Sequence, residues 1–374
     1  MAKDIKIEDA FNMPGATLVD VRSENEYNED TIPGAVNIPL LNNEERAMVG
    51  TVYKRENPVK ARRLGLNLIS PRLPAMLREY EQKASNGRDV VLFCWRGGLR
   101  SQFVTYMLDL MGFNVYRVAG GYKSYRKYIN SYLERELPHR AVVIHGLTGV
   151  GKTEVLKGLE ARGLPVLDLE GLACHRGSVF GKIGMPLSPS QKKFESMIVK
   201  NFVASAKQGV FVVECESKRL GRLLVPQSVI NSMKMGYNIL LYASIQERIH
   251  RSVKEYVSGS DANMQSLVEA IQSITRYLGN AKADKLVNLL REKKYEDAVE
   301  ILLLDYYDPL YKYPNGPDSS YHLSVDTGNI NRAVDVVAEF VAGLPEYGIP
   351  VNGGVRVGNR ESPEGSQGSQ GSFA

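Results

Sequence analysis

Through the first 133 residues, short apolar runs alternate with longer segments in which apolar residues recur at helical spacing. The runs "ATLVDV", "AVNIP", "DVVLFC" and "NVYRV" predict strands, and "DVVLFC", which lies between charged residues, predicts a buried parallel strand. The stretch "LRSQFVTYMLDLMG" predicts a helix ending at Gly112, and "SENEYNED" predicts a short acidic helix capped by Ser23. This alternation predicts one α/β domain over residues 1–133, with a parallel sheet covered on both faces.

A second alternation begins after "ELPHR", which predicts a linker. The runs "AVVIH", "LPVLDL", "GVFVVE", "YNILLYAS" and "YHLSVD" predict strands, and "KTEVLKGLEARG" predicts a helix. A charged stretch over about 260–304 has helical spacing and no strand signal, so we expect a helical insertion there. We therefore predict a second α/β domain over 139–345, followed by a disordered Gly/Ser/Gln-rich tail over 351–374.

Composition adds limits on partners and compartment. The 374 residues carry a formal net charge of +5, which permits an anionic partner without demanding one. The sparse, odd set of Cys94, Cys174 and Cys215 is typical of free thiols in a reduced cytosolic protein. The stretch "MAKDIKIEDAF" lacks the apolar core of a signal peptide, and no uncharged run approaches the ~18 residues of a transmembrane helix. We expect a cytoplasmic protein with no membrane partner.

The stretch "LFCWRGGLRS" places Cys94 where a predicted strand ends, which is where open α/β sheets bind ligands. Its glycines let backbone amides turn inward, and the start of the next helix adds positive potential; together with the arginines, these features favour a reactive thiolate. We predict an anion cradle around Cys94 that consists of Arg96, Gly97, Gly98, Arg100 and Ser101. The loop by itself is compatible with phosphatase chemistry and with transfer of sulfur or selenium.

The stretch "GLTGVGKT" matches the phosphate-loop pattern G-x-x-x-x-G-K-[ST] between a predicted strand and helix. We predict that it binds a diphosphate through Gly146, Gly149, Gly151, Lys152 and Thr153. Thr153 would be a ligand if Mg²⁺ binds, and the sequence leaves the metal requirement open. A phosphate loop indicates that a phosphate chain binds, without indicating that ATP is hydrolysed.

Several polar residues follow the neighbouring strands of the second domain. Acidic residues there either face the phosphate loop or only cap the next turn, and the loop "DLEGLACHRGSVFG" has a composition suited to substrate positioning or proton transfer. The candidates for supporting or acid–base roles are Asp168, Glu170, His175, Arg176, Glu214 and Glu216. The segment "YYDPLYKY", Tyr306 to Tyr313, either lines a pocket or belongs to the core.

Two stretches combine basic residues with aromatic or apolar ones: "VYKRENPVKARRLG" and "YKSYRKYINSY". Such stretches are typical of nucleic-acid binding, because phosphates are neutralised and bases can stack; the alternative is a solvated helix face. The candidate contacts are Lys54, Arg55, Lys60, Arg62, Arg63, Lys123 and Arg126.

The motif "CWRGGLRS", flanked by "LVDVRSENEY", "TIPGAVNIP" and "RVAGGYKSYRKY", resembles rhodanese-like domains, in which a loop cysteine carries sulfur. Two departures stand out. Thr31 stands where many members have His, and the Cys-x5-Arg spacing from Cys94 to Arg100 is one residue longer than usual, as in phosphatase relatives of the fold. Phe93 stands where such phosphatases usually have His, and no leaving-group acid is evident.

The ordered set "LLNNEERAMVGTVYK", "CWRGGLRS", "GLTGVGKT", "DLEGLACHRGSVFG", "ECESKRLG" and "YYDPLYKY" resembles the bacterial tRNA 2-selenouridine synthase family over about residues 15–315. The resemblance implies a rhodanese-like domain followed by a P-loop NTPase-like α/β domain with the helical insertion. It also implies replacement of the sulfur of wobble 2-thiouridine in tRNA by selenium. In the family's route, geranyl diphosphate first alkylates the sulfur, and selenium from selenophosphate then takes its place.

By their chemistry, the phosphate loop fits the first step, in which it would bind geranyl diphosphate, and Cys94 fits the second step as the selenium-carrying nucleophile. No tightly bound cofactor is expected, Mg²⁺ is a candidate ion, and the enzyme that supplies selenophosphate is a candidate partner beside the tRNA. Two other hypotheses stay open: a Cys-x5-Arg phosphatase fused to a P-loop kinase, and an RNA-binding module with a degenerate rhodanese fold.

Overall fold

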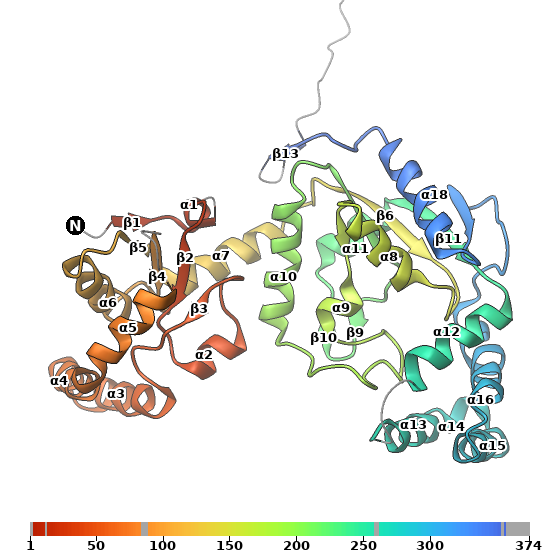
Figure 1. The fold of residues 1–374 in the computed structure, drawn as a ribbon, viewed down its shortest axis with the longest axis horizontal. Coiled ribbons are helices and arrows are strands. Elements are labelled where there is room, and N and C mark those ends of the chain that lie inside the picture. Colours follow the sequence, from red (N-terminus) through yellow and green to blue (C-terminus); the bar gives the residue numbers. More distant parts are fainter. Residues whose placement is uncertain (1–2, 12, 84–88, 258–261, 353–354, 357–374) are drawn as a thin grey trace, which may run out of the picture.

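The chain folds around two parallel β-sheets that lie side by side (Figure 1). The structure is a computed structural model, and it describes residues 3–11, 13–83, 89–257, 262–352 and 355–356. Within those residues, no helix is long and apolar enough to cross a membrane. Helices cover the sheets, so the predicted class of α/β domains with parallel sheets is confirmed.

The first sheet has the order β1-β5-β4-β2-β3, and every neighbouring pair is parallel. Four of its strands are the predicted ones: β2 (Thr17–Asp20), β3 (Val36–Asn37), β4 (Val90–Phe93) and β5 (Val115–Val118). The edge strand β1 (Lys3–Ile5) was not predicted, because its residues are largely exposed and form no apolar run. The central strand β4 is buried at all four residues, as its apolar composition predicted.

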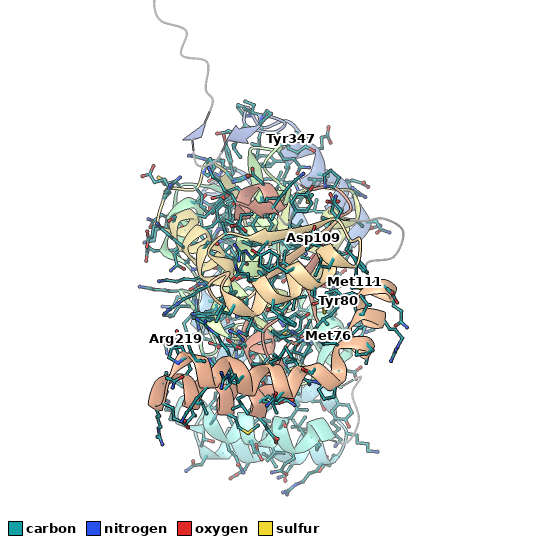
Figure 2. The ribbon with its side chains drawn as sticks, turned by 90° about the vertical axis from the view of Figure 1, so that its left-hand side faces the viewer. Met76, Tyr80, Asp109, Met111, Arg219 and Tyr347 are labelled. Atoms are coloured by element: carbon teal, nitrogen blue, oxygen red, sulfur yellow. The ribbon has the colours of Figure 1, made fainter. Side chains whose placement is uncertain are left out.

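Helices α1 (Ile7–Phe11), α2 (Glu24–Glu29) and α6 (Leu99–Leu110) lie between these strands in the chain, and α7 (Gly121–Leu133) follows β5. Three further helices, α3 (Asn43–Arg55), α4 (Pro58–Ile69) and α5 (Leu73–Lys83), follow β3, with a short 3₁₀ turn (Ser70–Arg72) before α5. Met76 and Tyr80 of α5 are buried in the core, whereas much of α3 and α4 is exposed (Figure 2). The predicted cap at Ser23 is confirmed as a capping box with Glu26.

The second sheet has the order β12-β11-β6-β8-β7 and is also parallel throughout. Its strands are β6 (Arg140–His145), β7 (Val166–Leu167), β8 (Val210–Glu214), β11 (Tyr237–Tyr242) and β12 (Leu323–Asp326), all of which the apolar runs predicted. One face packs against α8 (Lys152–Ala161) and α18 (Ile330–Ala342). The other packs against α9 (Leu169–Ala173), α10 (Gln191–Ala204), α11 (Gln227–Lys234) and the hairpin β9 (Arg219–Leu220) and β10 (Leu223–Leu224).

The charged stretch between β11 and β12 forms a helical unit with its own apolar core. It includes α12 (Ile245–Val257), α13 (Ala262–Ser273), α14 (Thr275–Leu278), α15 (Asn280–Arg291) and α16 (Tyr295–Leu302). A π-helical turn, Leu303–Tyr307, leads directly into α17 (Asp308–Tyr311). At the other end of the domain, the segment we predicted to be disordered begins with paired strands β13 (Val351–Asn352) and β14 (Val355–Arg356); its residues 353–354 and 357–374 lie outside the described residues.

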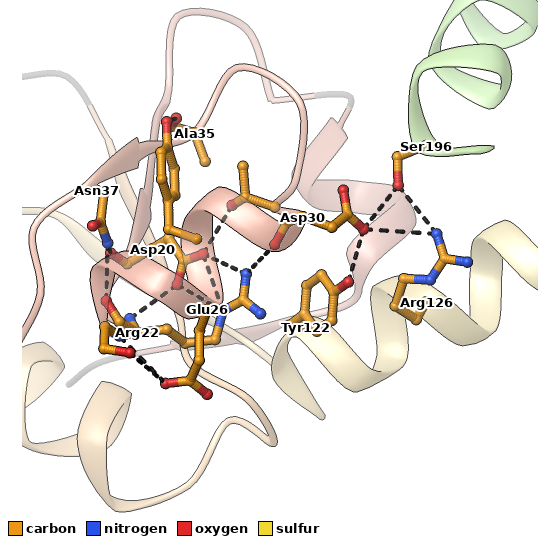
Figure 3. A network of polar contacts seen from close by, with 12 residues as sticks. Asp20, Arg22, Glu26, Asp30, Ala35, Asn37, Tyr122, Arg126 and Ser196 are labelled. Atoms are coloured by element: carbon orange, nitrogen blue, oxygen red, sulfur yellow. Dashed lines mark hydrogen bonds and ion pairs between the residues drawn. The ribbon is translucent and has the colours of Figure 1, made fainter. Parts of the chain in front are cut away.

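The two sheets are joined through α7, which packs against α10 (Figure 1). Arg126 of α7 forms an ion pair with Glu195 and donates a hydrogen bond to the Ser196 hydroxyl at 3.2 Å, while Ser196 donates to Asp30 at 3.1 Å (Figure 3). Tyr122 also donates to Asp30, at 2.7 Å. Arg126 is therefore held in the contact between the two domains. Our expectation that it contacts tRNA stays a prediction, because aromatic–basic composition alone does not distinguish an interface arginine from a phosphate-binding one.

Candidate functional site

Cys94 lies at the carboxyl end of β4, in the loop that leads into α6. Its side chain is buried, with only 3% of the residue exposed, and the Ser101 hydroxyl donates a hydrogen bond to Sγ at 3.2 Å. Gly97 adopts a φ of 64° and Gly98 is the N-cap of α6, so the loop turns tightly around the sulfur. Ser101, which we predicted to bind an anion, thus contacts the thiol itself.

The turn between β5 and α7 holds the Cys94 loop in place. The backbone amides of Tyr122 and Lys123 donate to the carbonyl oxygens of Cys94 and Trp95, at 2.8 and 2.9 Å. Gly121 has a φ of 58°, and a Cβ there would collide with the Cys94 carbonyl oxygen and the Gly97 amide. The second glycine of "RVAGGYKSYRKY", Gly121, is therefore required by the close approach of two backbones rather than by a contact with substrate.

Arg100 forms an ion pair with Glu26 of α2, with 2.7 Å between Nη1 and Oε2. Burial opposes ionisation of Glu26, but Arg100 and Arg46 more than compensate and hold the pKa of that carboxyl below its usual value. Sequence reasoning missed this partner, because Glu26 and Arg100 are 74 residues apart in the chain. The arginine predicted to bind an anion is thus pre-positioned by a carboxylate.

The Cys94 loop opens onto a wide groove whose other wall is α3. Basic side chains dominate its polar lining: Arg46, Lys54, Arg55, Arg96 and Arg100. Trp95 and Tyr53 line the same groove and are exposed. The remaining predicted tRNA contacts outside the domain interface, Lys60, Arg62, Arg63 and Lys123, are exposed as well. A neighbouring apolar hollow, lined in part by Leu66 and Phe103, adjoins this groove.

The phosphate loop connects β6 to α8, as the motif predicted. The Lys152 ammonium donates to the carbonyl oxygens of Gly146 and Leu147 at 2.9 and 3.3 Å, which places it across the loop. Gly149 has a φ of 81°, and a Cβ there would lie 2.7 Å from the Arg248 carbonyl oxygen. The loop is therefore packed against the helical unit as well as against the sheet.

Two arginines of α12 hold this loop, and no local motif identified either. Arg248 is buried; its Nε donates to the Thr148 carbonyl oxygen at 2.9 Å, and its guanidinium forms an ion pair with Asp308 at 2.5 Å. Arg251 donates to the Val150 carbonyl oxygen at 3.1 Å and lines the cavity above the loop. In the sequence, Asp308 lies within "YYDPLYKY", but this segment does not indicate that Asp308 pairs with Arg248.

The cavity above the phosphate loop is unusually rich in carboxyl groups. Glu170 and Glu216 line it and share a hydrogen bond, and burial together with their mutual repulsion favours the protonated form and raises the pKa of Glu216. Burial, reinforced by Asp168, raises the pKa of Glu214 to about 8. A phosphate chain bound here would therefore lie next to the Glu216 carboxyl group, which is largely neutral at pH 7.

The other predicted residues of this domain divide into two groups. Arg176 lines the cavity and forms an ion pair with Glu255 at 2.7 Å. Asp168 instead caps α9, accepting from the Gly171 amide at 2.7 Å, and Glu214 accepts from the Glu170 amide at 2.9 Å. His175 packs close to two glycines outside the cavity lining, and burial lowers its pKa.

Three tyrosines of "YYDPLYKY" line the cavity, so this segment belongs to a pocket. Tyr307 and Tyr311 stack with ring centroids 6.2 Å apart, and Tyr311 stacks on Tyr313 at 6.3 Å. Thr153 also lines the cavity. Among the residues that the structure describes, no group of three or more His, Cys, Asp or Glu side chains is arranged to hold a metal ion. Magnesium at Thr153 stays a prediction.

Comparison with known protein families gives a match for each of the two domains. Residues 139–341 match the family model described as the tRNA 2-selenouridine synthase AAA domain, and residues 6–128 match the rhodanese-like domain. The chain belongs to the tRNA 2-selenouridine synthase family. The resemblance noted in the sequence motifs is thereby confirmed.

Individual members of the tRNA 2-selenouridine synthase family are similar over most of their length. The synthase of Cupriavidus pinatubonensis is 34% identical over 331 residues, which cover 80% of this chain and 89% of the relative. That of Pseudomonas putida is 33% identical over 326 residues, covering 79% and 87%. Among solved structures, the N-terminal domain of a putative ATP/GTP binding protein from Clostridium difficile 630 is 39% identical and covers 34% of this chain and 98% of that chain, with a TM-score of 0.33.

Proposed function

We propose that this member of the family replaces the sulfur of wobble 2-thiouridine in tRNA with selenium, by alkylation with geranyl diphosphate and then selenation from selenophosphate. One observation carries the proposal: two anion cradles, each a glycine-rich loop between a parallel strand and a helix, occur in one chain. One contains a thiol and the other a phosphate-loop lysine. A sequence with two chemically different steps needs two such sites.

The first step belongs to the phosphate loop in this proposal. The thiocarbonyl sulfur of the uridine forms a bond to C1 of geranyl diphosphate, and the C1–O bond breaks with its electron pair on the leaving diphosphate. Lys152 and the loop amides stabilise the negative charge that develops there. Neutral Glu216 reduces repulsion of the diphosphate and can donate a proton to it.

The second step belongs to Cys94. Its thiolate attacks the selenium of selenophosphate, and the Se–P bond breaks with its electrons left on phosphorus, which departs as phosphite. The resulting selenylsulfide attacks C2 of the alkylated uridine through selenium, and geranylthiolate leaves. A small thiol then cleaves the S–Se bond, which releases the selenouridine, and a second thiol regenerates Cys94. Arg96 and Arg100 line the groove beside Cys94 and would bind the phosphate side of the donor.

The basic groove also accounts for the tRNA. Lys54 and Arg55 lie on α3 beside the loop, where they can neutralise phosphates of the anticodon arm. Exposed Tyr53 and Trp95 offer ring faces on which an unpaired anticodon base can stack. This arrangement favours tRNA modification over a free-standing phosphatase or kinase, neither of which needs a nucleic-acid surface.

Mass spectrometry of 2-thiouridine tRNA tests the proposal. The full chain is incubated with geranyl diphosphate alone, with selenophosphate alone, and with both, in the presence of a small thiol. We expect S-geranyl-2-thiouridine in the first incubation and 2-selenouridine in the third. Unchanged nucleoside mass in all three would show a binding module, and thiol-independent turnover of an aryl phosphate that Cys94→Ser abolishes would show a phosphatase.

A further inference from the structure

An apolar cavity lies directly beside the phosphate-loop cavity, inside the helical unit between β11 and β12. Its walls are almost entirely hydrophobic and come from five helical segments and the loop before α10; they include Phe180, Leu267, Ile271, Leu290, Ala298 and Leu302. Thr148 of the phosphate loop and Tyr307 of the π-helical turn line both this cavity and the phosphate-loop cavity. A single ligand can therefore have a polar end on the loop and an apolar end inside the helical unit.

Two features indicate that this space is built to bind a ligand. First, the wall includes Leu303 and Tyr307 of the π-helical turn, and such turns within helices are frequent at functional sites. Second, the Ser252 hydroxyl lines the cavity next to Gly149 and finds no hydrogen-bond partner among the described residues, although Ser252 is only 3% exposed. A buried hydroxyl without a partner is unfavourable, so a ligand atom at the mouth of the cavity would satisfy it.

The lining restricts the chemistry of the ligand. A nucleoside would bring a ribose and a base into walls that offer few polar atoms, which is unfavourable. A branched hydrocarbon chain matches them. The space between these walls amounts to about 530 Å³ when the part that is open to solvent is included.

We propose that this cavity binds the hydrocarbon chain of a prenyl diphosphate whose diphosphate lies on the phosphate loop. The identification of that ligand as geranyl diphosphate rests on the proposed function. The reacting carbon C1 then lies between Thr148 and Tyr307, where chain and diphosphate meet. The Tyr307 ring can stabilise positive charge that develops at C1 as the diphosphate leaves. Tyr311 and Tyr313 continue on the open side, where the uridine would approach and stack.

Binding to the full chain tests this assignment by calorimetry with two probes, geranyl diphosphate and inorganic diphosphate. Ala298→Phe places a ring into the cavity from α16. We expect this substitution to lower the affinity for geranyl diphosphate at least tenfold and to change the affinity for inorganic diphosphate by less than twofold. Leu66→Phe fills the competing apolar hollow beside the Cys94 groove and should change neither affinity. Loss of geranyl diphosphate binding in Leu66→Phe, with wild-type binding in Ala298→Phe, would overturn the assignment.

A variant that enlarges the cavity gives the opposite effect. Leu290→Ala removes a wall side chain, and we expect it to shift the preference toward farnesyl diphosphate at least fivefold relative to geranyl diphosphate. If either substitution prevents folding, hydrogen exchange of the wild-type chain with each probe bound tests the proposal instead. Geranyl diphosphate should protect amides of α13 and α16 that inorganic diphosphate leaves unprotected, and equal protection by both probes would overturn the proposal.

The outcomes also separate this inference from the proposed function. If the wild-type chain and Ala298→Phe alkylate 2-thiouridine tRNA equally well, the proposed function stands and the assignment of the cavity as the prenyl site is wrong. Wild-type chain that binds inorganic diphosphate but neither prenyl diphosphate would contradict both the function and the cavity.

Discussion

The Cys94 loop and the phosphate loop are alike in backbone and different in surroundings. Each follows a buried parallel strand, turns through at least one glycine with positive φ and ends at the start of a helix. The first opens onto a wide basic groove, whereas the second lies under a helical unit, among carboxyl groups and tyrosines. The same local solution for binding an anion is thus directed to different substrates by neighbours that come from distant parts of the chain.

The largest effects should come from substituting Lys152 and Cys94, because each substitution should abolish one of the two steps and leave the other intact. Lys152→Ala removes the charge that stabilises the leaving diphosphate, and we expect S-geranylation to fall at least about 100-fold. Cys94→Ser should abolish selenation of pre-geranylated tRNA and leave geranylation intact. Nucleoside mass spectrometry with each substrate measures the yields of the two steps. Lys157→Ala, at an exposed position, and Cys174→Ser, at a position that lines neither the phosphate-loop cavity nor the Cys94 groove, are the controls. Normal selenation by Cys94→Ser would remove the carrier role.

The next largest effect should come from a substitution in the contact between the two domains. Arg126→Ala removes an ion pair with Glu195 and a hydrogen bond to Ser196. We expect a loss of about 2 kcal/mol in the stability of the interface, since hydrogen bonds to charged groups contribute roughly 1.5–3 kcal/mol. Scanning calorimetry should show a lower, broader transition, and exposed Lys127→Ala on the same helix is the matched control. A selective loss of tRNA affinity with unchanged melting would show that Arg126 is a nucleic-acid contact.

The carboxyl groups make the phosphate-loop cavity sensitive to pH. Burial raises the pKa of Glu214 from its ordinary 4.5 to about 8, so the folded protein holds this proton more tightly than the unfolded chain. The resulting stability is complete below pH 4.5 and is lost as the pH rises toward 8. Because Glu216 ionises with a raised pKa as well, diphosphate binding should weaken by about tenfold, or ~1.4 kcal/mol, between pH 7 and 9.

Calorimetric titration of inorganic diphosphate at each pH measures this effect. Glu216→Gln should flatten the decrease, and comparison with the wild type at the same pH cancels the ionisation of the diphosphate itself. Equal slopes in the two proteins would show that the Glu170–Glu216 pair does not control binding.

The smallest effect concerns the exposed basic residues. Arg63→Ala on α4 should weaken tRNA binding two- to threefold and reduce the salt dependence by about 0.7–0.9 in slope, the value for one phosphate contact. Filter binding across salt concentrations measures both quantities, with exposed Lys285→Ala of α15 as the control. An unchanged slope would show that α4 is only a solvated helix.

The sequence determined the local architecture of both sites. Apolar runs predicted nearly every strand of the two sheets, and Cys94 and Lys152 were identified from their loops, because strand burial and glycine-rich turns depend on neighbouring residues. It did not indicate that Glu26 holds Arg100, or that Arg248 and Asp308 support the phosphate loop. These partners lie far apart in the chain, so only packing brings them together. Tertiary structure alone also decided that Arg126 joins the domains and that an apolar cavity adjoins the phosphate loop, since both depend on surfaces contributed by separate elements.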